Sequence, residues 1–160
     1  MNLKQLFFSI LLIFSLTSYC QKRQITLLTD SIVIGDNFTT RQIKFNLGKS
    51  TLSSDSSATL DSVVTFMNKY KNIIIEIGVY SDTKTSDLCC SNPTQEKSEN
   101  ILKYLTQHGI SNSRLIAKGY GETKLLISDT TIAQAKTMEE KESMHYYNRR
   151  VVFEIIGFIK

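Results

Sequence analysis

Hydrophobic and polar positions alternate along this chain in short blocks, which predict four strands and two main helices. Between Arg41 and Leu47 every second residue is apolar, which predicts a half-buried strand that ends at Gly48. Residues 73–80 (IIIEIGVY) are apolar at nearly every position, as expected for a central strand that is covered on at least one face. Two later strands are expected at residues 115–120 (LIAKGY) and 151–156 (VVFEII).

Two amphipathic helices are expected between these strands. After several serine caps at 53–57, apolar residues recur at helical spacing up to about Tyr70: Leu60, Val63, Val64 and Met67. The second helix starts at Pro93, where a missing amide donor costs no hydrogen bond, and ends before Gly109. The order strand–helix–strand–helix–strand–strand predicts an α+β two-layer sandwich, with both helices on one face of a mixed sheet.

The remaining segments give weaker patterns. Residues 24–40 contain two β-branched runs around a Gly-Asp turn, which fit either an edge hairpin or a lead-in arm. The polar stretch after Glu122 has poor apolar periodicity, and only residues 131–146 are expected to be partly helical. A chain of 160 residues has room for one ordinary domain. We therefore expect an arm or edge hairpin at 21–40 and a single domain at 41–158.

Residues 1–20 are typical of a secretory signal peptide. Lys4 precedes an apolar run from Leu6 to Leu16 that is too short to span a bilayer, and small or polar residues follow. Cleavage after Cys20 would release a mature protein that starts at Gln21. Alternatively, Cys20 is an acylated lipoprotein cysteine, although Tyr19 is bulky for that site. An uncleaved N-terminal anchor is the third alternative.

The net charge and the cysteine positions argue against a nucleic-acid partner and a zinc site. Loss of residues 1–20 removes Lys4 and no acid, which lowers the net charge from +4 to +3. The basic residues are scattered among acids, so a nucleic-acid partner is not expected. Cys89 and Cys90 are adjacent in a predicted loop and lack the ligand spacing of a zinc site. They could form a strained vicinal disulfide, remain free or bridge two molecules.

The sequence contains no motif that supports catalysis. There is no nucleophile elbow, phosphate-binding loop, metal motif or pair of catalytic carboxylates. The two histidines do not change this: His108 lies at a predicted helix end, where a cation complements the helix dipole, and His145 has no nucleophile at a recognisable spacing. We expect a non-enzymatic protein without a cofactor or metal.

One pair of opposite charges is placed where a small zwitterion could bind. Asp82 lies two positions after the end of the strand at 73–80, and Lys97 lies in the first turns of the next helix, 15 positions later. Both side chains could face one crevice at the edge of the sheet, beside a helix N-terminus that attracts anions. On spacing alone, two unrelated surface charges are the favoured interpretation of this carboxylate and ammonium.

The span from about Ile43 to Ile156 resembles the OmpA-like domain, the peptidoglycan-binding module of outer-membrane proteins, peptidoglycan-associated lipoproteins and flagellar stators. The matching pieces are IKFNLGKSTL, IEIGVYSDT, YLTQHGI, SRLIAKGYGET and NRRVVFEI, in the order of the family. GYGE followed by NRR before the last strand is the most specific element. The resemblance implies the α+β fold expected above and a non-catalytic, peptidoglycan-binding function.

In that family an Asp and an Arg, 15 residues apart, bind the diaminopimelate of the stem peptide. The resemblance assigns these positions to Asp82 and Lys97 and implies that Phe45, Asn46 and Thr83 lie around the site. Asn148 and Arg149 of the NRR element are expected either to border the site or to order the last strand.

Several site positions differ from the family pattern. Tyr80 stands in place of a histidine, Ser81 of a threonine, Thr85 of a glycine, Cys90 of an asparagine and Lys97 of an arginine. Lys97 keeps the charge but lacks the bidentate fork of a guanidinium. Losing one charge-assisted hydrogen bond costs about 1–2 kcal/mol, or roughly tenfold in affinity.

The resemblance implies an exported protein of the periplasm, or of the periplasmic face of the outer membrane if Cys20 is acylated. Its expected partner is the peptidoglycan stem peptide, bound with weakened affinity. The alternative is a degenerate OmpA-like domain that binds another envelope protein.

Overall fold

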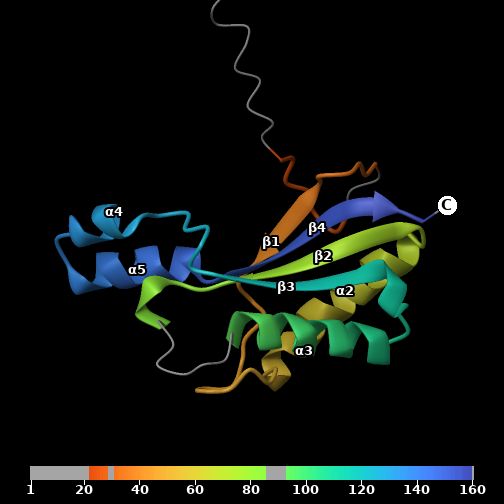
Figure 1. Ribbon diagram of the computed structural model, residues 1–160, viewed down its shortest axis with the longest axis horizontal. Coiled ribbons are helices and arrows are strands. Elements are labelled where there is room, and N and C mark those ends of the chain that lie inside the picture. Colours follow the sequence, from red (N-terminus) through yellow and green to blue (C-terminus); the bar gives the residue numbers. More distant parts are fainter. Residues whose placement is uncertain (1–21, 29–30, 86–92, 160) are drawn as a thin grey trace, which may run out of the picture.

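The computed structural model describes residues 22–28, 31–85 and 93–159, which form a four-stranded mixed sheet with helices (Figure 1). The predicted signal peptide, Cys20, Cys89 and Cys90 lie outside the described residues. The strands are β1 (Asn37–Thr40), β2 (Ile73–Tyr80), β3 (Leu115–Gly121) and β4 (Arg150–Phe158). The α-helices are α2 (Ser57–Lys69), α3 (Pro93–Gln107), α4 (Asp129–Ala133) and α5 (Met138–Asn148).

The strand order is β1-β4-β2-β3, with β4 antiparallel to both neighbours and β2 parallel to β3. Helices α2 and α3 lie on the same face of this sheet (Figure 1). Their apolar stripes meet alternate residues of β2 and β4 in a core that includes Leu60, Val63, Met67, Ile75, Ile77, Ile101, Leu105 and Phe153. The predicted α+β sandwich with two helices on one face is therefore confirmed.

The predicted strand at 41–47 is wrong. Ile43 is buried, but Leu47 is fully exposed in a turn that contains Gly48 at φ +68°. The backbone N–H of Lys44 donates to the Ser56 hydroxyl, and that hydroxyl donates to the carbonyl oxygen of Lys44. These backbone groups are therefore not available to a neighbouring strand. The edge position beside β4 is instead taken by β1, which lies within the segment interpreted as an arm or hairpin.

An ion pair between Arg23 and Asp36 stabilises the described N-terminal residues at this edge of the sheet. Both the Nε and Nη2 atoms of Arg23 donate to the carboxylate of Asp36, whose side chain is fully buried, and Val33 N donates to the same group at 2.8 Å. These contacts lower the pKa of Asp36, with the Arg23 hydrogen bond as the main cause. A single parallel bridge, Gln24 to Asn37, adds to the sheet edge. The described parts of this segment, residues 22–28 and 31–37, are therefore held against the edge of the sheet.

A glycine lets the start of α3 pack directly on strand β3. A Cβ at Gly119 would lie 2.2 Å from the backbone nitrogen of Gln95. At this contact the Gln95 amide accepts a hydrogen bond from Gly119 N at 2.7 Å and donates to Ala117 O at 3.3 Å. The side chain thus satisfies part of the open edge of β3, and it fixes the first turns of α3, which carry Thr94 and Lys97.

Helices α4 and α5 extend beyond one end of the sheet (Figure 1). The polar segment predicted to be partly helical thus forms two helices, each with its own cap. The hydroxyl of Ser128 accepts from Thr131 N, and Thr137 forms a reciprocal capping box with Glu140. Caps rather than apolar periodicity define these helices, which explains why the hydrophobic pattern was poor.

Candidate functional site

A pocket of about 220 Å³ lies where the start of α3, the end of β2 and the start of β4 meet. The segment that follows β1 and the last turn of α5 close its sides. Its lining residues are Thr40, Arg41, Ile43, Phe45, Val79, Tyr80, Ser81, Thr94, Lys97, Tyr146, Arg149, Arg150 and Val151. Four of these are cations, three are aromatic and none is an acid, so the described walls favour an anionic group with apolar surface beside it.

Lys97 contributes an ammonium to this pocket from the first turns of α3. Its Nζ lies 5.4 Å from the centroid of the Phe45 ring, within the range of a cation–π contact. No hydrogen bond or ion pair to Lys97 occurs among the described residues. Phe45 and Lys97, both expected at the site, are therefore brought together, and the ammonium keeps its capacity to bind an anion.

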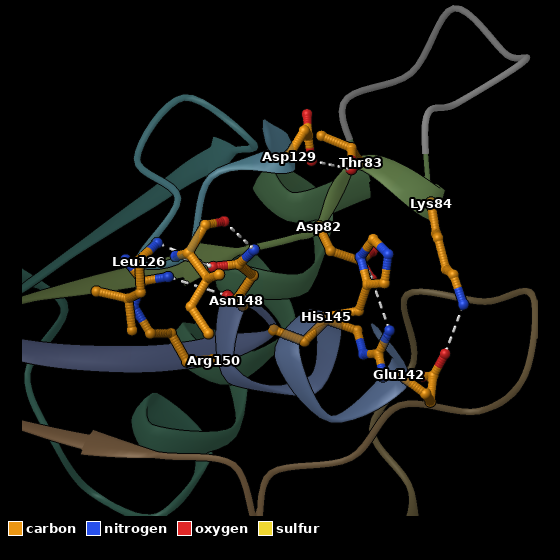
Figure 2. Close-up of polar contacts among 11 residues, drawn as sticks. Asp82, Thr83, Lys84, Leu126, Asp129, Glu142, His145, Asn148 and Arg150 are labelled. Atoms are coloured by element: carbon orange, nitrogen blue, oxygen red, sulfur yellow. Dashed lines mark hydrogen bonds and ion pairs between the residues drawn. The ribbon is translucent and has the colours of Figure 1, made fainter. Parts of the chain in front are cut away.

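Asp82 lies directly behind the pocket rather than in its wall. Its side chain has no exposed surface, and its Oδ2 accepts a hydrogen bond from Nη1 of Arg149 at 2.6 Å. Nδ1 of His145 lies 3.4 Å from the same oxygen, and Figure 2 shows the imidazole beside Asp82. The expected arrangement, with Asp82 and Lys97 facing one crevice as an opposite pair, is replaced by an Asp82–Arg149 pair with Lys97 on another wall.

Arg149 is shared between two carboxylates. While Nη1 binds Asp82, Nη2 donates to Glu142 at 2.6 Å. Glu142 also accepts a hydrogen bond from Lys84 at 2.6 Å (Figure 2). The hydrogen bonds from Lys84 and Arg149 lower the pKa of Glu142 to about 2. For Arg149, burial lowers the pKa, whereas Glu142 and Asp82 raise it and prevail. The network joins the turn after β2 to α5 through alternating charges.

Tyr80 is held between two side chains from the neighbouring strands. The guanidinium carbon of Arg150 lies 3.9 Å from the Tyr80 ring centroid, and the Tyr120 ring stacks on Tyr80 at 4.7 Å. Burial and the neighbouring Tyr120 raise the pKa of Tyr80 to about 12. Burial and a hydrogen bond to Glu76 raise the pKa of Tyr120 to about 12, and burial lowers that of Arg150. Tyr80 is thus an uncharged side chain packed between Arg150 and Tyr120, at a position where the family resemblance implies histidine.

Three other expected residues lie away from the pocket. Asn46 is exposed and donates to Thr51 Oγ1 and Leu52 O, which stabilises the turn at 46–51. Thr83 donates to Asp129 and connects the turn after β2 to α4. Asn148 is fully buried: its Oδ1 accepts from Leu126 N and Ile127 N, and its Nδ2 donates to Ile127 O. Asn148 therefore orders the loop before α4, while the next residue, Arg149, lines the pocket.

Sequence reasoning missed several residues of this site, including three charged or aromatic lining residues and one buried histidine. Arg41, Tyr146 and Arg150 line the pocket, and His145 contacts its buried carboxylate. The sequence could have pointed to His145, because it precedes Arg149 by four positions, and residues at this spacing lie on the same face of a helix. No local pattern could have pointed to Arg41, because its position depends on where the edge strand β1 ends.

The sheet, the two helices on one face and the cationic pocket define the class of this protein. The model of the OmpA family matches residues 44–138, more than half of the chain, and the chain belongs to that family. It is therefore an OmpA-like, non-catalytic module of the cell envelope. No helix in the part of the chain that the structure describes is long and apolar enough to cross a membrane.

Individual relatives agree with this assignment. Outer membrane protein P5 of Haemophilus influenzae is 26% identical over 115 residues, which are 72% of this chain and 32% of that protein. The chain thus spans about a third of the length of this relative. Among solved structures, a MotB-like protein from Desulfovibrio vulgaris is similar with a TM-score of 0.58, at 22% identity and with 75% and 73% of the two chains covered.

The peptidoglycan-associated lipoprotein of Burkholderia pseudomallei has a TM-score of 0.54 at 15% identity, over 70% of this chain and 86% of that one. At these identities the two solved structures show the shared fold alone. They confirm the expected fold family and leave the ligand of this chain to be inferred from its own pocket.

Proposed function

We propose that this chain is an exported, peptidoglycan-binding module that takes a diaminopimelate-type stem peptide into the pocket between α3 and β4. The observation that carries the proposal is the meeting of Lys97 and Arg149 on the walls of one pocket, with Asp82 directly behind Arg149. Membership of the OmpA family and the likeness to a peptidoglycan-associated lipoprotein support the same ligand.

The cations of the pocket would bind the carboxylates of such a ligand. The Lys97 ammonium is a compact charge that binds one carboxylate oxygen, whereas a guanidinium at the same place would bind two. Arg149 offers a second cation, which is 38% exposed at its side chain. We assign Asp82 a positioning role, because its carboxylate is not exposed, is bound by Arg149 and faces His145. Direct contact with a ligand ammonium would require the Asp82 side chain to become exposed to the pocket.

The location of the protein follows from the same proposal. A cleaved signal peptide would release the module into the periplasm, whereas acylation of Cys20 would hold it at the periplasmic face of the outer membrane. Either form could reach the cell wall. The division into a signal peptide at 1–20, an arm or edge hairpin at 21–40 and a domain at 41–158 is part of this proposal, as is the weakened affinity that Lys97 implies.

A second candidate function is the binding of another envelope protein. The observation that favours it is the exposure of large apolar residues on and near α4 and α5. Met138 is 73% exposed, Leu126 59%, Tyr146 50% and Tyr147 49%. Exposed aromatic and apolar side chains on a projecting lobe are typical of protein interfaces.

Cosedimentation of the purified mature protein with sacculi separates the two candidates. The proposal predicts that the wild type sediments with sacculi and that Lys97→Ala reduces this fraction. Lys103→Ala provides a matched control, because Lys103 is an exposed lysine on the same helix and does not line the pocket. Wild-type protein that stays in solution, or Lys97→Ala protein that sediments as well as Lys103→Ala, would contradict the proposal.

A further inference from the structure

His145 is a buried side chain with an unfilled hydrogen-bonding position at the back of the pocket. Its side chain is only 9% exposed, and its Nδ1 has no hydrogen-bond partner among the described residues. The same atom lies 3.4 Å from Oδ2 of Asp82, close enough for an ion pair once the imidazole is protonated but longer than an ordinary hydrogen bond. His145 therefore faces a carboxylate that is already bound by Arg149.

Among the residues that the structure describes, the charges around His145 come from three parts of the fold. Asp82 follows β2, Lys84 lies in the turn after it, and Glu142 and Arg149 come from α5 and its C-terminal cap. With a neutral imidazole these four groups, joined by the contacts Lys84–Glu142–Arg149–Asp82, carry no net charge. Protonation of His145 adds one positive charge, with Asp82 as its nearest counter-ion.

Protonation of His145 would change what Arg149 can do. Asp82 would then have two cationic partners for one buried carboxylate, so its attraction would be divided between them. Arg149 would be held less tightly and would be freer to bind a carboxylate in the pocket, where its side chain is already partly exposed. The added positive charge also attracts an anion through the poorly solvated interior. Both effects strengthen the binding of a carboxylate in the pocket.

We infer that His145 is a positioning residue whose protonation strengthens carboxylate binding in this pocket, so that the module binds more tightly in mildly acidic surroundings. This inference rests on the proposed function, because it concerns the same pocket. Histidine is the side chain that ordinarily changes charge between about pH 5 and 8, where peptide carboxylates remain ionised. A coupling between one proton and one ligand carboxylate of on the order of fivefold in affinity is typical of such linked sites.

The test is isothermal titration of a purified diaminopimelate-containing stem peptide into the mature protein at about pH 5.5 and about pH 7.5. We expect wild-type affinity to be on the order of fivefold higher at the lower pH. His145→Gln, which cannot be protonated, should lose this difference. His108→Gln is the matched control: His108 is the only other histidine, is exposed at the end of α3 and stacks on Tyr104. It should retain the difference.

Failure of the inference and failure of the proposed function give different results. Wild-type affinity that is equal at both pH values, or a pH dependence that persists in His145→Gln, would overturn the role of His145 while leaving stem-peptide binding intact. No binding at either pH would overturn the proposed function itself.

If His145→Gln does not fold, NMR titration of the two imidazoles in the wild type provides the answer. Because linkage is reciprocal, saturating stem peptide should move the titration of His145 to higher pH and leave that of His108 unchanged. Equal behaviour of the two rings would contradict the inference.

Discussion

Nη1 of Arg149 lies 2.6 Å from Oδ2 of Asp82, a carboxylate with no exposed side-chain surface. This contact turns the acid expected to bind a ligand ammonium into the internal counter-ion of a pocket cation. Together with Lys97 on the start of α3, Arg149 gives the pocket two positive groups that approach from different elements.

Loss of Arg149 should destabilise the protein more than loss of Lys97. Arg149→Met would remove the guanidinium that binds the buried Asp82 carboxylate, which costs about 3 kcal/mol in unfolding free energy. Adding Asp82→Asn to that variant should recover a large part of the loss, because an amide is cheaper to bury than a carboxylate. Chemical denaturation of the single and double variants measures both effects. An Arg149→Met variant as stable as the wild type would show that the buried pair is unimportant.

Gly119 should not tolerate even one methyl group. In Gly119→Ala the new Cβ would lie 2.2 Å from Gln95 N and 2.6 Å from Gln95 Cα, so α3 must shift away from β3. We expect a loss of about 1–3 kcal/mol or more. Gly157→Ala is the control, since its Cβ would meet only the flexible Cδ1 of Ile74 at 3.6 Å. Equal melting temperatures for the two variants would contradict the close packing of α3 on β3.

Asn148 should act as a structural residue rather than a ligand. Asn148→Ala removes three hydrogen bonds to the backbone of residues 126 and 127 and leaves buried groups unsatisfied, at a cost of about 3 kcal/mol. Amide hydrogen exchange at Leu126 and Ile127 should accelerate. Asn68→Ala, at an exposed position on α2, should change stability by less than about 0.5 kcal/mol. Unchanged exchange at both amides would contradict this role.

The stacked tyrosines predict a loss of stability at high pH. In the fold the pKa values of Tyr80 and Tyr120 are raised to about 12, whereas an unfolded tyrosine titrates near 10. The unfolded state therefore loses these protons first, and the stability that they contribute is complete below about pH 10 and falls as the pH rises toward 12. Denaturation midpoints across this range should fall less in a Tyr80→Phe/Tyr120→Phe variant. An equal fall in both proteins would show that the two phenols are not responsible.

The sequence predicted the layers of the fold well, because they depend on local periodicity. The run at 73–80 became β2, and the stripe of Leu60, Val63 and Met67 became the buried face of α2. Alternation failed at 41–47, where the backbone of Lys44 is bound by a serine side chain rather than a strand. Which segment fills a sheet edge depends on long-range pairing that a local pattern does not contain.

The site was predicted less completely, for a similar reason. Family resemblance pointed to Lys97, which lines the pocket, and to the neighbourhood of Asp82, because both occupy fixed positions relative to regular elements. Asp82 is bound by Arg149, which is 67 positions away in the chain, and no spacing rule connects the two residues. Arg41 enters the pocket only because the chain leaves the sheet after β1.

The affinity of a purified diaminopimelate-containing stem peptide for wild type, Lys97→Ala and Lys97→Arg tests the central claim most directly. Isothermal titration should show weaker binding by roughly tenfold or more in Lys97→Ala, because a charge-assisted hydrogen bond is lost. Lys97→Arg should bind more tightly than wild type, because it restores a bidentate fork. Equal affinity for all three proteins would contradict the claim that Lys97 holds a ligand carboxylate in this pocket.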